Sequence, residues 1–453
     1  MENVYIMGYI QRARGAQKEF EKYNQEQVDE VVKIVAKVVH DNAEVLAEMA
    51  IEETGMGVYK DKVVKNQMKA KVIWNNLKGK KSVGIIERND ATGITKIAKP
   101  MGVAAAITPC TNPIVTPMSN AMFALKGRNA IVITPHHRAL RCSTATVDMI
   151  NAELKKIGAP KNLIQILDQQ SRENTRDLIA GADVVIATGG MGMVKAAYSS
   201  GKPALGVGAG NVQCIMDRDA DIQDAVPKII TGRIFDNGII CSGEQSVIMP
   251  EEKYNEIIDV FKENGAFYVS DTAQKEAFRN AIFEAGHMNR HAIGQSVQAI
   301  AKLANVSVPE NTRVIVIEAD GSGDDDILAK EKMCPVLAAY KYKDFKEAVV
   351  IAKDNLEAEG KGHSVAIHSN TLENIEYAGE QLEASRFVVN QASATNAGGS
   401  FFNGLAPTNT LGCGSWGNNS ISENLDYKHL INISRIAHFM KDNPVPTDEE
   451  LWR

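Results

Sequence analysis

The stretch Val184-Val185-Ile186-Ala187-Thr188-Gly189-Gly190-Met191-Gly192-Met193-Val194-Lys195 indicates the fold class. Its first five residues are apolar or β-branched and predict a buried strand, and the glycines that follow predict a tight turn into a helix. Backbone amides at the start of such a helix, together with the helix dipole, suit a pyrophosphate. Because Lys195 stands where the last glycine of Gly-x-Gly-x-x-Gly is needed, the motif alone equally allows an ordinary strand-to-helix turn.

The same alternation of strand and helix surrounds this unit. Strand signals at 102–107, 129–134, 163–167 and 184–188 alternate with helical stretches at about 114–127, 139–157, 171–181 and 191–200. Short apolar strands separated by helices predict a doubly wound parallel sheet, which binds nucleotides outside the carboxyl ends of its strands. A second α/β region follows, with strands expected at 246–249, 314–317, 336–340, 364–368 and 387–390. We therefore expect an α/β protein with domains over 1–232 and 233–417 and a C-terminal segment over 418–453.

Residues 82–99 have a different character. Two β-rich runs, 82–88 and 94–98, flank the turn cluster Asn89-Asp90-Ala91-Thr92-Gly93 and predict a hairpin. Such a ribbon is either a plain surface feature or an arm whose exposed edge pairs with another subunit. We expect a homodimer or higher oligomer with this hairpin and a strand at 430–437 at the subunit boundary.

Composition excludes several classes of partner. The 453-residue chain has a formal net charge of -6 without long runs of one sign, so we expect no binding to nucleic acid or to an anionic membrane. The N-terminus does not have the pattern of a secretory signal, and no apolar run is long enough to span a bilayer. The six cysteines are widely spaced and include no Cys-x-x-Cys pair, which predicts a reducing compartment and no structural metal. We expect a cytoplasmic protein with small-molecule ligands.

One cysteine stands in a segment suited to chemistry, Asp236-Asn237-Gly238-Ile239-Ile240-Cys241-Ser242-Gly243-Glu244-Gln245-Ser246. Its glycines let the backbone fold tightly and let another molecule approach the thiol. Cys241 is either a buried free cysteine or a nucleophile whose surroundings favour the thiolate. The glycine cluster 206–211 is likewise either a loop that lines a site or a linker.

Several motifs, in the same order across nearly the whole chain, resemble the aldehyde dehydrogenase superfamily. Residues 237–244 resemble its nucleophile segment, and 108–113 resemble the loop whose Asn completes the oxyanion hole. Residues 331–336 resemble the segment whose Glu holds the nicotinamide ribose, and 188–190 its phosphate-binding turn. More narrowly, the motifs at 111–113, 240–245, 411–420, 422–424 and 428–435 resemble the CoA-acylating branch, and within it the members that interconvert succinyl-CoA and succinate semialdehyde.

The resemblance implies a set of roles. Residues 1–232 become a nicotinamide cofactor domain, 233–417 a catalytic thiol domain, and 418–453 a segment that joins the cofactor domain or the subunit interface. Cys241 becomes the nucleophile and Asn112 an oxyanion donor, with NADP or NAD as cofactor, CoA as co-substrate and no metal. The implied cofactor-binding residues are Thr108, Thr134, Pro135, His136, Arg138, Thr188, Gly189, Gly190, Gly208, Glu331 and Pro335.

Two departures from the superfamily pattern bear on the specificity for the acyl acceptor and for the cofactor. Hydrolytic members carry Glu-Leu-Gly-Gly-Lys, whose Glu activates water, whereas residues 206–211 here contain no acid. Water, with a pKa of about 15.7, needs such a base, and a thiol with a pKa of about 8.5 does not, so thiolysis is favoured over hydrolysis. The Lys-Pro-x-Glu contact to the adenosine ribose is replaced by residues 134–138, so Arg138 either pairs with a 2′-phosphate or is a solvated charge.

The remaining roles are open between alternatives. His363 either relays the CoA proton or is structural, and Arg386, Ser242 and Ser393 are candidates for binding a distal substrate carboxylate. The alternative activities are CoA-dependent oxidation of another short aldehyde such as acetaldehyde, or a phosphate-dependent reductase. A non-catalytic role in a filament or compartment is disfavoured because every catalytic position is filled.

Overall fold

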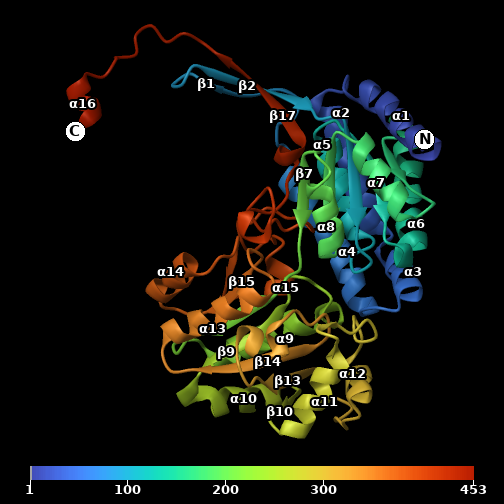
Figure 1. The fold of residues 1–453 in the computed structure, drawn as a ribbon. Coiled ribbons are helices and arrows are strands. Elements are labelled where there is room, and N and C mark those ends of the chain that lie inside the picture. Colours follow the sequence, from blue (N-terminus) through green and yellow to red (C-terminus); the bar gives the residue numbers. More distant parts are fainter. Residues whose placement is uncertain (1–2) are drawn as a thin grey trace.

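The computed structural model describes residues 3–453, which form two α/β lobes and a projecting arm (Figure 1). The first lobe contains one five-stranded sheet in the order β5-β4-β3-β6-β7, and each neighbouring pair in it is parallel. Its strands are β3 (Val103–Thr108), β4 (Ala130–Pro135), β5 (Ile164–Ile166), β6 (Val184–Thr188) and β7 (Ala204–Val207). The helices of this lobe are α1 (Val4–Phe20), α2 (Gln25–Asp41), α3 (Ala43–Thr54), α4 (Tyr59–Leu77), α5 (Val115–Lys126), α6 (Leu140–Lys156), α7 (Arg172–Gly181) and α8 (Met191–Tyr198).

The predicted parallel sheet of the first lobe is confirmed. Every residue of β3 and β4 is buried, as expected for central strands with both faces covered. The chain leaves β3 toward β4 on one side and reaches β6 on the other, so the strand order reverses at β3. Such a switch point opens a crevice at the carboxyl ends of the strands.

The second lobe contains a seven-stranded sheet in the order β10-β13-β14-β9-β8-β15-β16, again parallel throughout. Its strands are β8 (Val212–Met216), β9 (Glu244–Pro250), β10 (Ala266–Val269), β13 (Val314–Glu318), β14 (Val336–Tyr342), β15 (Val365–His368) and β16 (Phe387–Val389). Its helices are α9 (Ile222–Ile234), α10 (Tyr254–Glu263), α11 (Thr272–Ile282), α12 (Val297–Ala304), α13 (Phe345–Ala358), α14 (Leu372–Gln381) and α15 (Ser393–Asn396), and a short hairpin joins β11 (Phe283–Glu284) to β12 (His287–Met288).

The chain passes from one sheet to the other at residues 208–211. Gly206 and Val207 lie inside β7 rather than in a loop, and β8 already belongs to the second sheet. The chain therefore moves from the first sheet to the second before residue 232, where the domain boundary was expected. Whether residues 1–232 and 233–417 are separate domains stays a prediction. The two interpretations of the glycine cluster both hold, because the connection also contributes Gly208 to the cavity described below.

The arm is a three-stranded antiparallel sheet made from two distant parts of the chain. β1 (Gly84–Asn89) pairs with β2 (Ile94–Pro100), and β2 pairs with β17 (Ile431–Ala437). The predicted hairpin and the strand expected at 430–437 are thus confirmed, and Figure 1 shows both reaching away from the lobes, followed by the C-terminal helix α16 (Asp448–Trp452). None of the helices within residues 3–453 combines the length and hydropathy needed to span a membrane.

Candidate active site

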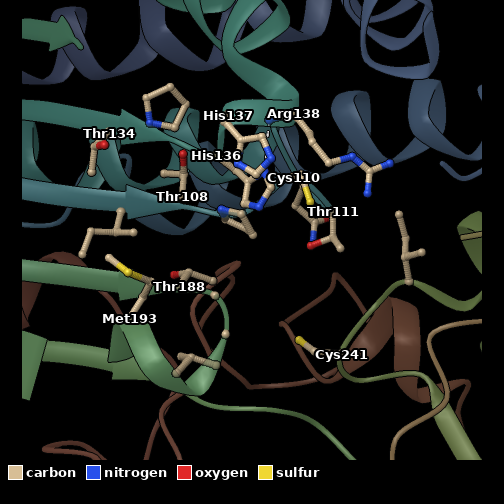
Figure 2. Close-up of a pocket in the computed structure, with 18 of the residues that line it drawn as sticks. Thr108, Cys110, Thr111, Thr134, His136, His137, Arg138, Thr188, Met193 and Cys241 are labelled. Carbon is tan, nitrogen blue, oxygen red and sulfur yellow. Dashed lines mark hydrogen bonds between the residues drawn. The ribbon is translucent and has the colours of Figure 1, made fainter. Parts of the chain in front are cut away.

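A cavity of about 610 Å³ opens where the strands of the first lobe end and faces the second lobe. Figure 2 shows Cys241 across this cavity from Cys110 and Thr111, while Thr108, Thr134 and Thr188 come from the ends of β3, β4 and β6. The predicted site residues that line it are Thr108, Asn112, Thr134, Pro135, His136, Arg138, Thr188, Gly189, Gly190, Gly208, Cys241 and Glu331. One cavity therefore collects residues from six separate parts of the sequence.

The loop before Cys241 has an unusual backbone that tertiary contacts hold in place. Asp236 and Asn237 have left-handed φ values of 53° and 54°, and Gly238 follows at 73°. A Cβ on Gly238 would meet the Arg233 guanidinium and the Cys334 carbonyl, so a glycine is required there. Backbone strain of this kind persists only when its surroundings determine it, and it commonly marks a functional site.

The crossover between the lobes runs directly against Cys241. A Cβ on Gly210 would overlap the Cys241 carbonyl. The glycine-rich composition of this connection thus has a packing cause as well as a role in lining the cavity.

The Cys241 thiol itself lies in surroundings that disfavour its charge. Burial raises its pKa to about 12, the carboxyl of Glu331 adds to the increase, and the Arg386 guanidinium opposes it. The sulfur packs beside Val388, Ala397 and Leu411. The resting thiol is therefore protonated at neutral pH.

The side chain of Asn112 is oriented by a buried ion cluster. Lys65 Nζ donates to Asn112 Oδ1 at 2.8 Å and to Asp236 Oδ2 at 2.5 Å, and Lys62 Nζ lies 3.0 Å from the same carboxylate oxygen. An ammonium only donates, so this contact assigns the amide oxygen to Lys65 and leaves the amide N–H groups for another acceptor. Because Asp236 belongs to the loop before Cys241, one carboxylate connects Asn112, through Lys65, with the Cys241 segment.

The residues beyond β4 form a basic end of the cavity. The rings of His136 and His137 stack with centroids 4.2 Å apart, and Arg138 Nη2 donates to the Thr54 carbonyl at 2.8 Å. Sequence reasoning missed Gln170, Ser171, Arg172 and Thr175, which also line the cavity. Their position between the end of β5 and the start of α7 could have predicted that they line the site.

The Gly189-Gly190 turn before α8 fits the implied phosphate groups. No atom lies within 4 Å of the position where either glycine would carry a Cβ. Unobstructed backbone at a helix N-terminus is what a pyrophosphate requires. Glu331 also lines the cavity, and burial together with the nearby Glu359 raises its pKa to about 8.

Five predicted residues do not line the cavity. Pro335 accepts a backbone hydrogen bond from Ile315 within the second sheet. Ser242 Oγ donates to the Ala394 carbonyl at 3.5 Å, and the backbone N–H of Ser393 donates to the buried Glu244 carboxylate at 2.6 Å.

The other two, Arg386 and His363, are buried and contact each other. Arg386 donates to the carbonyls of His363, at 2.8 Å, and of Gly412. The ring of His363 is fully buried, its Nδ1 lies 2.9 Å from Ser364 Oγ, and burial lowers its pKa to about 3. His363 is thus held neutral in this state.

The sequence profile of the aldehyde dehydrogenase family matches residues 5–429. The chain belongs to the aldehyde dehydrogenase family. It is 58% identical over 449 residues to the "succinate-semialdehyde dehydrogenase (acetylating)" of Clostridium kluyveri, with 99% of each chain covered. The predicted family, its CoA-acylating branch and the enzymatic nature of the chain are confirmed by this similarity.

Solved aldehyde dehydrogenase structures have the same fold. An acetylating aldehyde dehydrogenase from Geobacillus thermoglucosidasius superposes with a TM-score of 0.94 at 37% identity, covering 97% of this chain and 98% of that one. The propionaldehyde dehydrogenase of Rhodopseudomonas palustris, solved with bound CoA and an acylated cysteine, superposes with a TM-score of 0.86 at 27% identity, covering 96% and 97%. The predicted aldehyde dehydrogenase-like architecture is confirmed.

Proposed function

We propose that this chain is a CoA-acylating aldehyde dehydrogenase that interconverts succinyl-CoA and succinate semialdehyde with NADP or NAD. The observation that carries the proposal is the 58% identity, over nearly the full length of both chains, to a relative named for this substrate. The cavity supports the reaction type, because it places the thiol of Cys241 and the amide of Asn112 in one space.

In this proposal each side chain has a defined role in the reaction. The Cys241 sulfur, once deprotonated, attacks the aldehyde carbon, and the amide N–H of Asn112 with the backbone N–H of Cys241 stabilises the oxyanion. When bound in this cavity, NADP or NAD would supply the acceptor for the hydride. The CoA thiol then attacks the thioester on Cys241, which forms the acyl-CoA and releases the Cys241 sulfur as the leaving group; in reverse the same groups reduce the acyl-CoA.

The cavity disfavours water as the final acceptor. Residues 206–211 supply no acid, and Glu331 is the only carboxylate among the described lining residues. Since burial raises the pKa of Glu331 to about 8, this group is mostly neutral at pH 7 and a poor base there. A thiol nucleophile does not need that base.

Three finer points belong to the same proposal. NADP is accepted, because His137, Arg138 and Arg172 surround the end of the cavity next to β4 and no acid stands among them. The arm joins subunits into at least a dimer, since both of its edge strands are open to pairing. The protein works in the cytoplasm, in agreement with its six free cysteines.

Steady-state kinetics with CoA and each cofactor test the proposal. Succinate semialdehyde, acetaldehyde and butyraldehyde are compared by kcat/KM, with inorganic phosphate replacing CoA in a parallel series. We expect succinate semialdehyde with CoA to give the highest value. A higher value for acetaldehyde or butyraldehyde would refute the substrate assignment, and turnover with phosphate but not CoA would refute the acyl acceptor.

A further inference from the structure

Helix α4 carries a row of lysines next to the active site, and although none of them is among the described residues that line the cavity, Lys65 contacts the lining residue Asn112. Lys62, Lys65 and Lys69 are spaced at i, i+3 and i+7 and therefore share one face of the helix. The first two both form ion pairs with the single carboxylate of Asp236. Lys69 lies one turn further along and has a different set of partners.

The Lys69 ammonium is desolvated and binds only neutral acceptors. Its Nζ donates to the carbonyls of Gly398 at 2.9 Å and of Thr408 at 3.1 Å. A Cβ on Gly398 would stand 2.7 Å from this nitrogen, so the glycine makes room for the cation. Among the described side chains no carboxylate forms an ion pair with Lys69, and burial lowers its pKa to about 8. An ammonium has three donors, so one remains for a further ligand.

Lys69 also lies near the reacting sulfur. Its acceptor Gly398 follows Ala397, which packs against Cys241, and its acceptor Thr408 precedes Asn409, which lines the cavity. The two groups are close enough for a thiolate at Cys241 to raise the pKa of Lys69. Lys69 and Cys241 therefore both contact the segment 397–398.

We propose that Lys69 binds the distal carboxylate of the substrate and so selects an aldehyde that carries an acid at its far end. The inference rests on the proposed function and names the residue behind its substrate class. A desolvated cation without a counter-charge is unfavourable, and an incoming carboxylate supplies that charge. Because only two methylene groups separate the aldehyde and the carboxylate of succinate semialdehyde, the anchor has to stand close to Cys241.

Two of the residues expected from sequence to hold this carboxylate are engaged elsewhere, and the third has no charge. Arg386 directs Nη1 and Nη2 to backbone carbonyls and Ser242 donates to Ala394, whereas the Ser393 hydroxyl is buried without a partner but supplies no positive charge. Lys69 combines an uncompensated charge with a remaining donor. It is therefore the better anchor.

The test compares two aldehydes of similar length that differ in the terminal group. In the full-length enzyme with CoA and cofactor, Lys69→Met is expected to lower kcat/KM for succinate semialdehyde roughly a hundredfold, the scale for losing one partner of a desolvated charge pair. For butyraldehyde kcat/KM is expected to change less than about threefold, because an apolar terminus makes no ion pair. Lys71→Met, at an exposed position of the same helix, is the matched control and is expected to match the wild type with both substrates.

The outcomes distinguish a failure of the Lys69 proposal from a failure of the proposed function. Equal losses of kcat/KM with both aldehydes would mean that Lys69 supports the fold or the thiol. An unchanged preference of the variant for succinate semialdehyde would remove Lys69 from the substrate site, and either result overturns only the role of Lys69. A wild-type enzyme that prefers butyraldehyde overturns the proposed function itself. Lys69→Gln, which retains a donor for the loop carbonyls, replaces the methionine variant if that protein does not fold.

Discussion

The amide of Asn112 illustrates how a single side chain is oriented by groups outside the reaction. Removing this donor in Asn112→Ala is expected to lower kcat roughly a hundredfold with little change in KM, the usual effect of losing one oxyanion-hole hydrogen bond. Lys65→Met alone is expected to lower kcat, because the amide loses the contact that assigns its orientation. In the Asn112→Ala background the same lysine change is expected to add little.

A double-mutant cycle of Lys65 and Asn112 shows whether Lys65 positions the Asn112 amide or only stabilises the fold. If Lys65 acts only through the ion cluster, Lys62→Met is expected to lower kcat as much as Lys65→Met, since both lysines bind Asp236. Additive losses of Lys65→Met and Asn112→Ala would contradict the positioning role. Thermal unfolding of each variant reports the structural contribution separately.

Glu331 sets part of the reactivity of the thiol. An ionised carboxylate near Cys241 disfavours the thiolate, so Glu331→Gln removes that repulsion and is expected to lower the pKa of Cys241. The rate of alkylation by iodoacetamide is followed against pH in the enzyme without cofactor. The rise in rate is expected at lower pH in the variant, and a rise at the same pH as in the wild type would exclude Glu331 as a cause.

At the residue scale, candidate functional residues can be predicted from sequence when they belong to a short motif. Asn112, Gly189, Gly190, Cys241 and Glu331 stand in such motifs, and the structure gathers them in one cavity. The contribution of Lys65 and Lys69 depends on which backbone carbonyls and side chains lie across the helix, and no local pattern contains that information.

At the scale of elements, α4 shows why a long helix escapes a periodicity argument. Its buried face contains Lys62, Lys65 and Asn66 among apolar residues, so the apolar stripe that identifies a helix is interrupted at the site. Most strands of both sheets were predicted, because their apolar runs are short and bounded by turns, but β8 and β10 of the second sheet were missed. The short strand β7 was concealed by Gly206, which accommodates the Tyr198 ring.

The starts of two elements are expected to influence the choice of cofactor. Arg138 lies in the 3₁₀ turn after β4 and Arg172 opens α7, and both line the same end of the cavity. We expect NADP to be accepted, and Arg138→Ala and Arg172→Ala to raise the Kd of NADP more than that of NAD. Fluorescence titration of the cofactor measures both constants. Equal changes for the two cofactors in both variants would remove these arginines from the 2′-phosphate contact.

The arm is expected to be an element of assembly. Ile85 on β1 and Ile436 on β17 are 42% and 46% exposed on its two edge strands, where unpaired backbone groups and apolar side chains favour association. Light scattering of the wild type is expected to give at least a dimer, and Ile85→Asp with Ile436→Asp a smaller species. A wild-type monomer at working concentration would contradict the role of the arm.

At the scale of the whole molecule, the arrangement of the two lobes is expected to decide which acceptor takes the acyl group. The first lobe contributes the ends of β3, β4 and β6, the second contributes Cys241 and Glu331, and the connection between the lobes adds Gly208 and Ala209 to the cavity. Neither lobe alone contains both Cys241 and the Gly189-Gly190 turn. Sequence order could not predict this meeting of the lobes without the family resemblance, because it depends on how two separate sheets pack.

This arrangement predicts that the acyl-enzyme waits for CoA. No described carboxylate other than Glu331 lines the cavity, and since its pKa is raised to about 8 it is mostly neutral at pH 7, so hydrolysis of the thioester is expected to be slow. Mixing enzyme, succinate semialdehyde and oxidised cofactor at pH 7 is expected to give one burst of reduced cofactor, stoichiometric with Cys241, followed by a stall that CoA relieves. Cys241→Ser, with a hydroxyl that is far harder to ionise, is the control and is expected to give no burst. Steady formation of the free acid without CoA would mean that a group in the cavity activates water. If Glu331→Gln then stopped that turnover, Glu331 would be the base.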